Sequence, residues 1–140
     1  VLVNRHYFPT PRVAVGTAIR RIATSCIDIS DGLLSDIKHI LKASNCGANV
    51  HVDRLPLSRA LTSAVTPKQA IEYALSAGDD YELIFSVSEE QRGSLETSLA
   101  STNVKATCIG QLTGHSGTLS LLKNNEKYTP TNPSGYEHAF

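Results

Sequence analysis

The fold is decided by residues 25–41, which read SCIDISDGLLSDIKHIL. Apolar and polar residues alternate over 25–30, which predicts a short, half-buried strand. From Asp31-Gly32 onward the apolar residues recur every three or four positions, as on one face of a helix: Leu33, Leu34, Ile37, Ile40 and Leu41. The pattern predicts a strand that turns sharply into an amphipathic helix, which ends at Cys46-Gly47.

The rest of the chain shows the same two periods in turn. Further strands are predicted at 48–53, 83–87, 104–113 and 118–123. Helices are predicted at 13–25, 66–77 and 88–101, with a short helical piece after 55–58. Because helices and strands interleave, we predict an α+β fold in which helices pack on a mixed sheet. No repeat or linker divides the sequence, so residues 1–140 are expected to form a single domain.

Cap and turn signals make this prediction more specific. Two of the helices open on sequences typical of a capping box, at 66–69 and 88–91. The prolines within residues 1–12 predict an extended arm, because proline disfavours a helix. Polar turns at 114–117 and 124–125 predict hairpins between the last strands.

The composition excludes several classes of protein. The chain has 140 residues, of which 41% are hydrophobic, enough for one buried core. Lys+Arg and Asp+Glu number 13 each, and this zero net charge argues against a nucleic-acid or membrane-surface binder. No apolar run is long enough for a transmembrane helix, and no signal-peptide pattern opens the chain. The cysteines form no Cys-x-x-Cys pair, which favours reduced thiols in a cytoplasmic protein.

The junction Asp28-Ile29-Ser30-Asp31-Gly32 is the first candidate functional site. Backbone N–H groups at a strand-to-helix junction can hold a phosphate, and adjacent carboxylates can hold Mg²⁺ against that phosphate. The structural alternative is that Ser30 caps the helix and Asp31 interacts with its dipole. That alternative leaves Asp28 without a role, although a carboxylate within a strand needs a partner.

The segment Gly78-Asp79-Asp80-Tyr81-Glu82 is the second candidate. Three carboxylates within four residues repel one another unless a cation or a cationic ligand compensates them. The alternative is a solvated acidic loop after a glycine that ends the helix. Phosphate-loop, dinucleotide, zinc-protease and serine-hydrolase motifs are absent from the sequence, and we predict no residue as a catalytic acid, base or nucleophile.

Four segments, in their order and spacing, resemble the thiamine-monophosphate kinases: IDISDGL (27–33), DRLPLS (53–58), AGDDYEL (77–83) and GYEH (135–138). The first segment occurs across a superfamily that includes aminoimidazole ribonucleotide synthetase and selenophosphate synthetase, whereas the combination is more specific. The resemblance covers the whole chain but only the C-terminal half of such an enzyme. It implies the fold of the C-terminal domain of aminoimidazole ribonucleotide synthetase-like proteins. Ala77 departs from the family, which usually has glycine there.

The activity that the resemblance implies is transfer of the γ-phosphoryl group of ATP to thiamine monophosphate. The product is thiamine diphosphate, and the transfer is direct and in line, with Mg²⁺. An N-terminal half, absent here, would supply much of the nucleotide and Mg²⁺ site and the dimer interface. The chain contains no Met, which agrees with a piece that folds but does not catalyse by itself. The full-length enzyme is expected to be a cytoplasmic homodimer.

The resemblance also implies roles for individual residues. Asp28 and Asp31 correspond to metal-binding aspartates, and Ser30 corresponds to a nucleotide-contacting serine. Asp79 corresponds to an acidic substrate contact and Tyr136 to an aromatic one; a carboxylate and an aromatic ring suit a flat thiazolium cation. The alternatives are a non-catalytic module of the same fold that senses a nucleotide or a thiamine compound, and another superfamily member such as selenophosphate synthetase.

Overall fold

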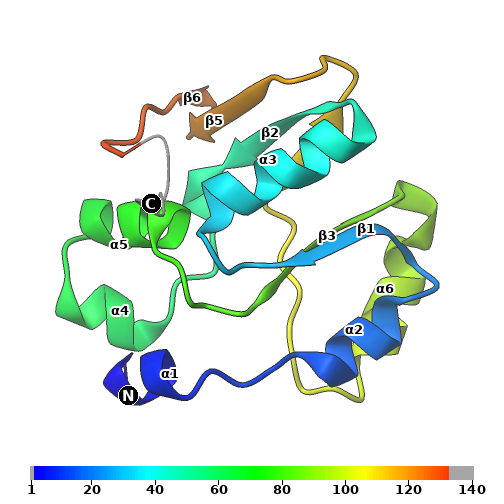
Figure 1. Cartoon of the computed structure of the whole chain (residues 1–140), viewed down its shortest axis with the longest axis horizontal. Helices are drawn as coiled ribbons and strands as arrows, with labels where there is room; N and C mark the ends of the chain where they lie inside the picture. The colour runs from blue at the N-terminus through cyan, green and yellow to red at the C-terminus, as the bar shows by residue number, and fades with distance from the viewer. Residues whose placement is uncertain (1, 133–140) are drawn as a thin grey trace, which may run out of the picture.

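The structure, a computed structural model, describes residues 2–132 (Figure 1). Its helices are α1 (Leu2–Tyr7), α2 (Val13–Ile19), α3 (Leu33–Ser44), α4 (Arg59–Ala64), α5 (Pro67–Ser76) and α6 (Arg92–Leu99). Its strands are β1 (Ala23–Asp28), β2 (Gly47–His51), β3 (Leu83–Val87), β4 (Gly110–Thr113), β5 (Leu119–Lys123) and β6 (Glu126–Lys127). Short 3₁₀ turns cover Val52–Arg54 and Glu89–Gln91. None of the helices in this part of the chain combines the length and apolar character needed to cross a membrane.

The strands form two sheets. β1 and β3 pair antiparallel, with Asp28 opposite Leu83. The other sheet has the order β4-β2-β5-β6, in which β2 is antiparallel to β4 and parallel to β5. The predicted α+β class with a mixed sheet is therefore confirmed.

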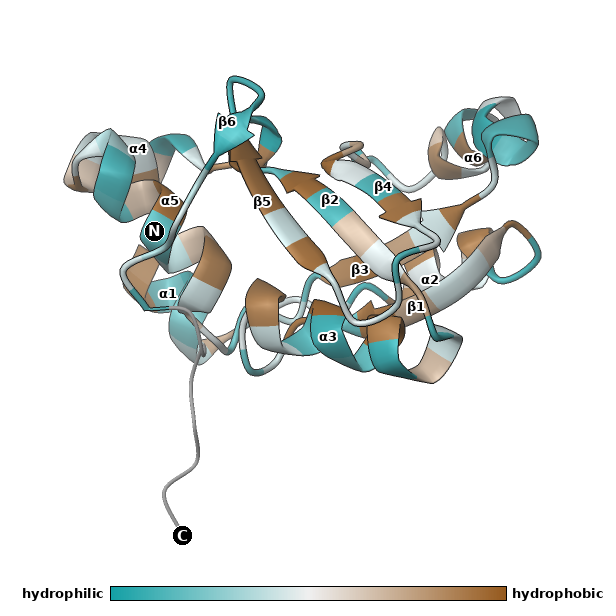
Figure 2. Cartoon of the chain, turned by 90° about the horizontal axis from the view of Figure 1, so that it is seen from above, coloured by the Kyte–Doolittle hydropathy of each residue, from teal (hydrophilic) through white to brown (hydrophobic). Residues whose placement is uncertain are grey.

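Two hydrophobic clusters hold the elements together. The larger joins α3 and α5 to the four-stranded sheet: Leu33, Leu34, Ile37, Leu41, Ala48, Val50, Val52, Leu55, Ile71, Leu75 and Leu121. The smaller joins α2 to α6 through Val15, Ile19 and Leu99, beside the apolar side chains of β3. In Figure 2 the hydrophobic β5 continues into the hydrophilic β6 at the edge of the sheet.

Local sequence signals determine several element ends. Thr66 and Gln69 form the predicted capping box at the start of α5, with Pro67 at the first helical position. α3 begins where predicted, but Asn45, at φ 49°, is the left-handed residue that ends it, rather than Gly47.

Other predictions were wrong. Residues 2–7 form α1 instead of an extended arm, because Pro9 and Pro11 lie beyond the helix end and do not interrupt it. The turn at 114–117 does not join a hairpin, because β4 and β5 lie on opposite sides of β2. The hairpin at 124–125 does form, between β5 and β6.

Several boundaries also differ from the prediction: the strands predicted at 25–30 and 48–53 are observed at 23–28 and 47–51. The helix from residue 13 ends at Ile19, since the chain from Ala23 pairs with β3. The side chain of Ser88 makes no cap hydrogen bond, and a 3₁₀ turn precedes α6. Of residues 104–113, only 110–113 form a strand, because the ladder with β2 extends no further.

Candidate functional site

The two acidic segments predicted from the sequence lie against each other, backbone to backbone. Beyond the last paired residues of β1 and β3, the Ile29 N–H donates to the Glu82 carbonyl at 2.8 Å. The Tyr81 N–H donates to the Ile29 carbonyl at 2.8 Å, and the Asp79 N–H to the Ser30 carbonyl at 2.9 Å. Residues 28–32 and 78–82 thus form one structural unit, which we call the acidic junction.

Two glycines allow this close approach. Gly32 has φ 104°, and a Cβ there would lie 2.9 Å from the Ser76 carbonyl oxygen. A Cβ on Gly78 would collide with the carbonyl oxygen of Ser30. Both positions therefore exclude a side chain, and each glycine belongs to one of the two segments that the sequence singled out.

Asp36 fixes the turn between β1 and α3. Its side chain is buried, with 2% of its surface exposed. Its Oδ2 accepts hydrogen bonds from the backbone N–H groups of Ser30, at 2.9 Å, and Asp31, at 3.1 Å. These two N–H groups, expected to be open to a phosphate, are already engaged by the chain's own carboxylate. Gly32 is the N-cap residue and no side chain caps α3, so the alternative in which Ser30 caps the helix is wrong.

Tyr81 lies among the carboxylates of the junction. Both Asp79, at φ 63°, and Tyr81, at φ 52°, adopt left-handed backbone conformations, which are uncommon for residues with side chains. The Tyr81 hydroxyl donates to Asp79 Oδ1 at 3.3 Å. This hydrogen bond and the charge of Asp79, together with the charges of Asp28 and Asp31, raise the pKa of Tyr81. Three of the predicted site residues are therefore within electrostatic reach of one hydroxyl.

Arginines from the N-terminal arm neutralise one carboxylate of the acidic loop. Arg12 Nε donates to Glu82 Oε2 at 2.8 Å and Arg12 Nη2 to Oε1 at 2.7 Å, while Arg5 also pairs with Oε1. The Arg12 hydrogen bonds lower the pKa of Glu82, although partial burial opposes this. Asp80 forms no such bond with any residue from 2 to 132; desolvation, and then the charge of Glu82, raise its pKa. The cation that the crowded carboxylates require is thus partly supplied by the chain.

A hollow of about 500 Å³ lies beside Asp28. Its walls are mostly apolar and come from the arm (Pro9, Pro11), from α2 (Val13), from β1 (Cys26) and from β3 (Leu83). Asp28 and Tyr81 also line it, so one carboxylate and one aromatic ring border an apolar space. Burial and the charge of Asp28 raise the pKa of the Cys26 thiol.

The predicted site residues have different placements. Asp28 is exposed at the end of β1, Ser30 and Asp31 are half-buried in the turn, and Asp79 is exposed in the loop. Tyr136 lies outside the described residues. Within residues 2–132, no group of three or more His, Cys, Asp or Glu side chains is arranged to hold a metal ion.

Three contributors to the junction were not identified from the sequence. Asp36 had a usable signal, because a carboxylate among the apolar positions of an amphipathic helix needs a buried partner. No sequence pattern indicated the roles of Arg12 and Arg5, since their partner Glu82 is 70 or more residues away in sequence.

The end of the described chain is attached to α5 through Glu72. The Tyr128 hydroxyl donates to Glu72 Oε1 at 2.6 Å, and the Thr131 N–H donates to Oε2 at 3.0 Å. Desolvation would raise the pKa of Glu72, but these hydrogen bonds outweigh it and lower that pKa. Desolvation and the Glu72 carboxylate raise the pKa of Tyr128 to about 12.

Comparison with known proteins places this geometry in a family. Residues 8–121 match the model of AIR synthase related protein, C-terminal domain. Thiamine-monophosphate kinase of Escherichia coli K12 is 47% identical over 137 residues, which cover 98% of this chain and 42% of that enzyme. The chain therefore spans about two fifths of the length of the curated relatives it matches.

Solved structures show the same similarity. The crystal structure of thiamine-monophosphate kinase from Stenotrophomonas maltophilia K279a superposes with a TM-score of 0.77 at 38% identity, covering 86% of this chain and 37% of that one. A structure described as AaThiL complexed with AMPPCP and TMP has a TM-score of 0.73 at 30% identity, covering 92% of this chain and 39% of that one.

Proposed function

The chain belongs to the family of AIR synthase related proteins, whose C-terminal domain it matches, and from this premise we propose that it is the C-terminal domain of a thiamine-monophosphate kinase. The complete enzyme would transfer the γ-phosphoryl group of ATP to thiamine monophosphate and release thiamine diphosphate. Support comes from the 47% identity to the Escherichia coli enzyme across 98% of this chain. A structural neighbour is described as a complex with AMPPCP and TMP.

The acidic junction is the observation that carries this proposal. Phosphoryl transfer depends mainly on positioning and on neutralising charge. Asp28 and Asp31 stand at the end of β1, and Asp79 is joined to the same turn through the Ser30 carbonyl. A solvated loop of unrelated function would need neither the two side-chain-excluding glycines nor the buried Asp36 that fix the turn.

Asp28 and Asp31 fit a role as Mg²⁺ ligands, with Ser30 as a nucleotide contact. Mg²⁺ usually takes one or two carboxylates, and waters and substrate phosphates complete its shell. Two carboxylates from this chain therefore suffice without a cluster of three. When bound, Mg²⁺ would neutralise the negative charge of the phosphates. Because Asp36 holds the turn by its backbone, the two aspartates keep their positions as charge develops on the transferred group.

Asp79 and Tyr136 are proposed as contacts for the thiamine moiety. The thiazolium ring carries a positive charge, which a carboxylate and an aromatic face both attract. Glu82 is already neutralised by Arg12 and Arg5, so Asp79 is a stronger candidate than Glu82 for pairing with a ligand cation.

The remaining features follow from the family resemblance. We propose that an N-terminal half of the same polypeptide supplies much of the nucleotide site, and that the complete enzyme is a cytoplasmic homodimer. Cys26, Cys46 and Cys108 are free thiols, as expected in a reducing compartment. Residues 1–140 would then form one of two domains and would be inactive in isolation.

Production of thiamine diphosphate from ATP, Mg²⁺ and thiamine monophosphate by the full-length protein tests the proposal. Asp28→Asn and Asp31→Asn should each lower kcat by about 100-fold or more, because they remove charge that acts in the transition state. Glu126→Gln, an equally conservative change at an exposed position of β6, should leave kcat unchanged. An absence of product from the wild-type protein would overturn the proposal. Lower melting temperatures with unchanged kcat would make the two aspartates structural.

A further inference from the structure

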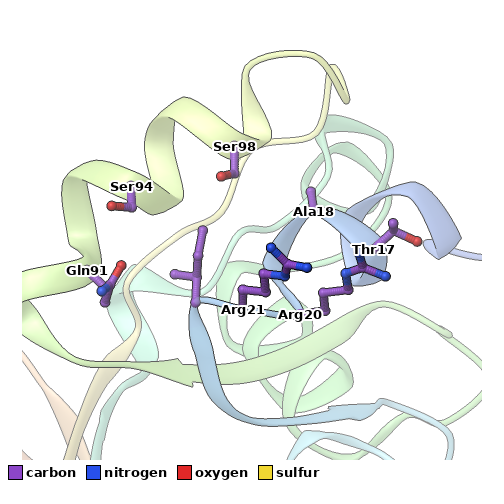
Figure 3. Close-up of a pocket in the computed structure, with 8 residues that line it drawn as sticks. Thr17, Ala18, Arg20, Arg21, Gln91, Ser94 and Ser98 are labelled. Carbon is purple, nitrogen blue, oxygen red and sulfur yellow. The ribbon is translucent and has the colours of Figure 1, made fainter.

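A polar hollow of about 450 Å³ lies between the C-terminal end of α2 and helix α6 (Figure 3). Its polar lining comes from Thr17, Arg20, Arg21, Gln91, Ser94 and Ser98. This hollow is distinct from the one beside Asp28. Val13 and Gly16 of α2 line the hollow beside Asp28, whereas residues between 17 and 22 line this one.

The α6 wall presents a row of hydrogen-bonding side chains. Ser94 and Ser98 lie four residues apart on one face of α6, and Gln91 is the N-cap residue of this helix. Leu95 and Leu99, on the neighbouring face, pack with the α2 cluster. Ser94 and Ser98 make no side-chain hydrogen bond with any residue from 2 to 132, although both line the hollow (Figure 3).

The α2 wall supplies positive charge. Arg20 and Arg21 both line the hollow, and the ion pairs of residues 2–132 use other arginines: Arg5, Arg12 and Arg92. Among residues 2–132, none of the side chains that line the space is acidic. The C-terminal end of a helix carries roughly half a negative charge, which two guanidinium groups exceed, so the hollow has a net positive potential.

From these walls we infer that the hollow is a binding site for a phosphate-bearing ligand. Guanidinium groups match phosphate oxygens with paired N–H donors, and the serine hydroxyls offer further donors from the opposite wall. The volume exceeds that of one phosphate and falls within the range of small-molecule sites, about 300–1,000 Å³. The expected ligand is therefore a diphosphate group, free or attached to a small molecule. This inference does not depend on the proposed kinase activity.

Titration of the ¹⁵N-labelled chain with inorganic pyrophosphate, at constant ionic strength and without Mg²⁺, tests the inference by NMR. Saturable shifts are expected for the amides of Arg20, Arg21, Ser94 and Ser98. Arg21→Gln should weaken binding about tenfold, because it removes charge-assisted hydrogen bonds. The control variant Arg92→Gln changes an exposed arginine of α6 that lies outside the hollow, and it should bind like the wild type.

A second titration with ADP distinguishes the sources of the diphosphate. Tighter binding of ADP would support a site for a nucleotide or similar phosphorylated molecule, and tighter binding of pyrophosphate would support a site for the free anion. Shifts that do not saturate, that map elsewhere, or that persist equally in Arg21→Gln would overturn the inference. The wild-type map decides the case even if a variant fails to fold.

Discussion

The acidic junction and the α2–α6 end of the molecule are held in different ways. At the junction, backbone hydrogen bonds join residues 28–32 to 78–82. The larger hydrophobic cluster lies next to these segments and includes side chains of α3 and α5. At the other end, three buried side chains, Val15, Ile19 and Leu99, hold two short helices together. Backbone contacts tolerate no change of position, whereas side-chain contacts can repack. We therefore expect the carboxylates to be held in place more firmly than the side chains at the α2–α6 end.

The largest effects should come from truncating each cluster. Leu75 is fully buried in the larger cluster, and Leu99 is 7% exposed in the smaller one. Leu75→Ala should lower the free energy of unfolding by about 3–5 kcal/mol, and Leu99→Ala by about 2–3 kcal/mol, because the smaller cluster can collapse around the lost volume. Urea denaturation followed by circular dichroism measures both. Equal losses of unfolding free energy would show that the two clusters resist truncation equally.

The next test concerns the glycines of the junction. Gly32→Ala and Gly78→Ala should each cost about 2–4 kcal/mol, since a Cβ would meet backbone atoms that cannot move independently. Gly93, in α6, has open space around it and is the matched control. Gly93→Ala should be neutral or stabilising by up to about 1 kcal/mol. A junction glycine that accepts alanine at no cost would show that the two loops can separate.

How much the sequence could predict depends on how local the signal is. The capping box of α5 lies within four residues, and its prediction was confirmed. The hairpin predicted at 114–117 was wrong, because β2, more than 60 residues earlier, lies between the two strands. A turn motif shows that the chain reverses direction, but it cannot show that a strand distant in sequence lies between the two strands that the turn connects.

The same distinction applies to the candidate site. Both acidic segments were identified from their residues, and the structure brings them together at Ser30 and Asp79. The position of Asp36 among apolar residues indicates a buried partner, but neither its hydrogen bonds to the turn nor the pairing of Arg12 with Glu82 could be predicted. Such contacts depend on the path of the backbone between remote segments. The assigned roles of Asp28, Ser30, Asp31, Asp79 and Tyr136 stay predictions until ligands are tested.

A smaller effect is expected from releasing the N-terminal arm. The Arg12 and Glu82 side chains are 24% and 41% exposed, so solvent screens their pairing, and Arg12→Gln should cost about 1 kcal/mol. Arg92→Gln breaks a longer, more exposed pair with Glu89, at 3.2 Å, and should cost less than about 0.5 kcal/mol.

The pH dependence of this stability loss tests whether pairing with the charged Glu82 causes it. The pKa of Glu82 is lowered in the folded state, so its contribution is present above the ordinary value of 4.5 and is lost as pH falls through the folded pKa. Melting temperatures measured from pH 3 to 7 should therefore differ most between wild type and Arg12→Gln near neutrality, and converge in acid. A difference that persists at pH 3 would assign the effect of Arg12 to packing instead.

An effect as small as that of Arg12→Gln is expected where the chain beyond β6 meets α5. The hydroxyl of Tyr128 donates to Glu72, and its pKa is raised to about 12 from 10.0. A raised tyrosine pKa stabilises the fold below the ordinary value, and this stabilisation is lost as pH rises from 10 toward 12. Tyr128→Phe should lower the melting temperature by roughly 3 °C at pH 7, corresponding to about 1 kcal/mol for one hydrogen bond. The difference from the wild type should shrink above pH 10.

Absorbance at the tyrosinate band provides the direct measurement, because one late titration step should disappear in Tyr128→Phe and persist in Tyr73→Phe. If the late titration of Tyr128→Phe equals that of the wild type, the attachment to Glu72 is not maintained in solution, and the chain beyond β6 belongs with the weakly held parts of the molecule.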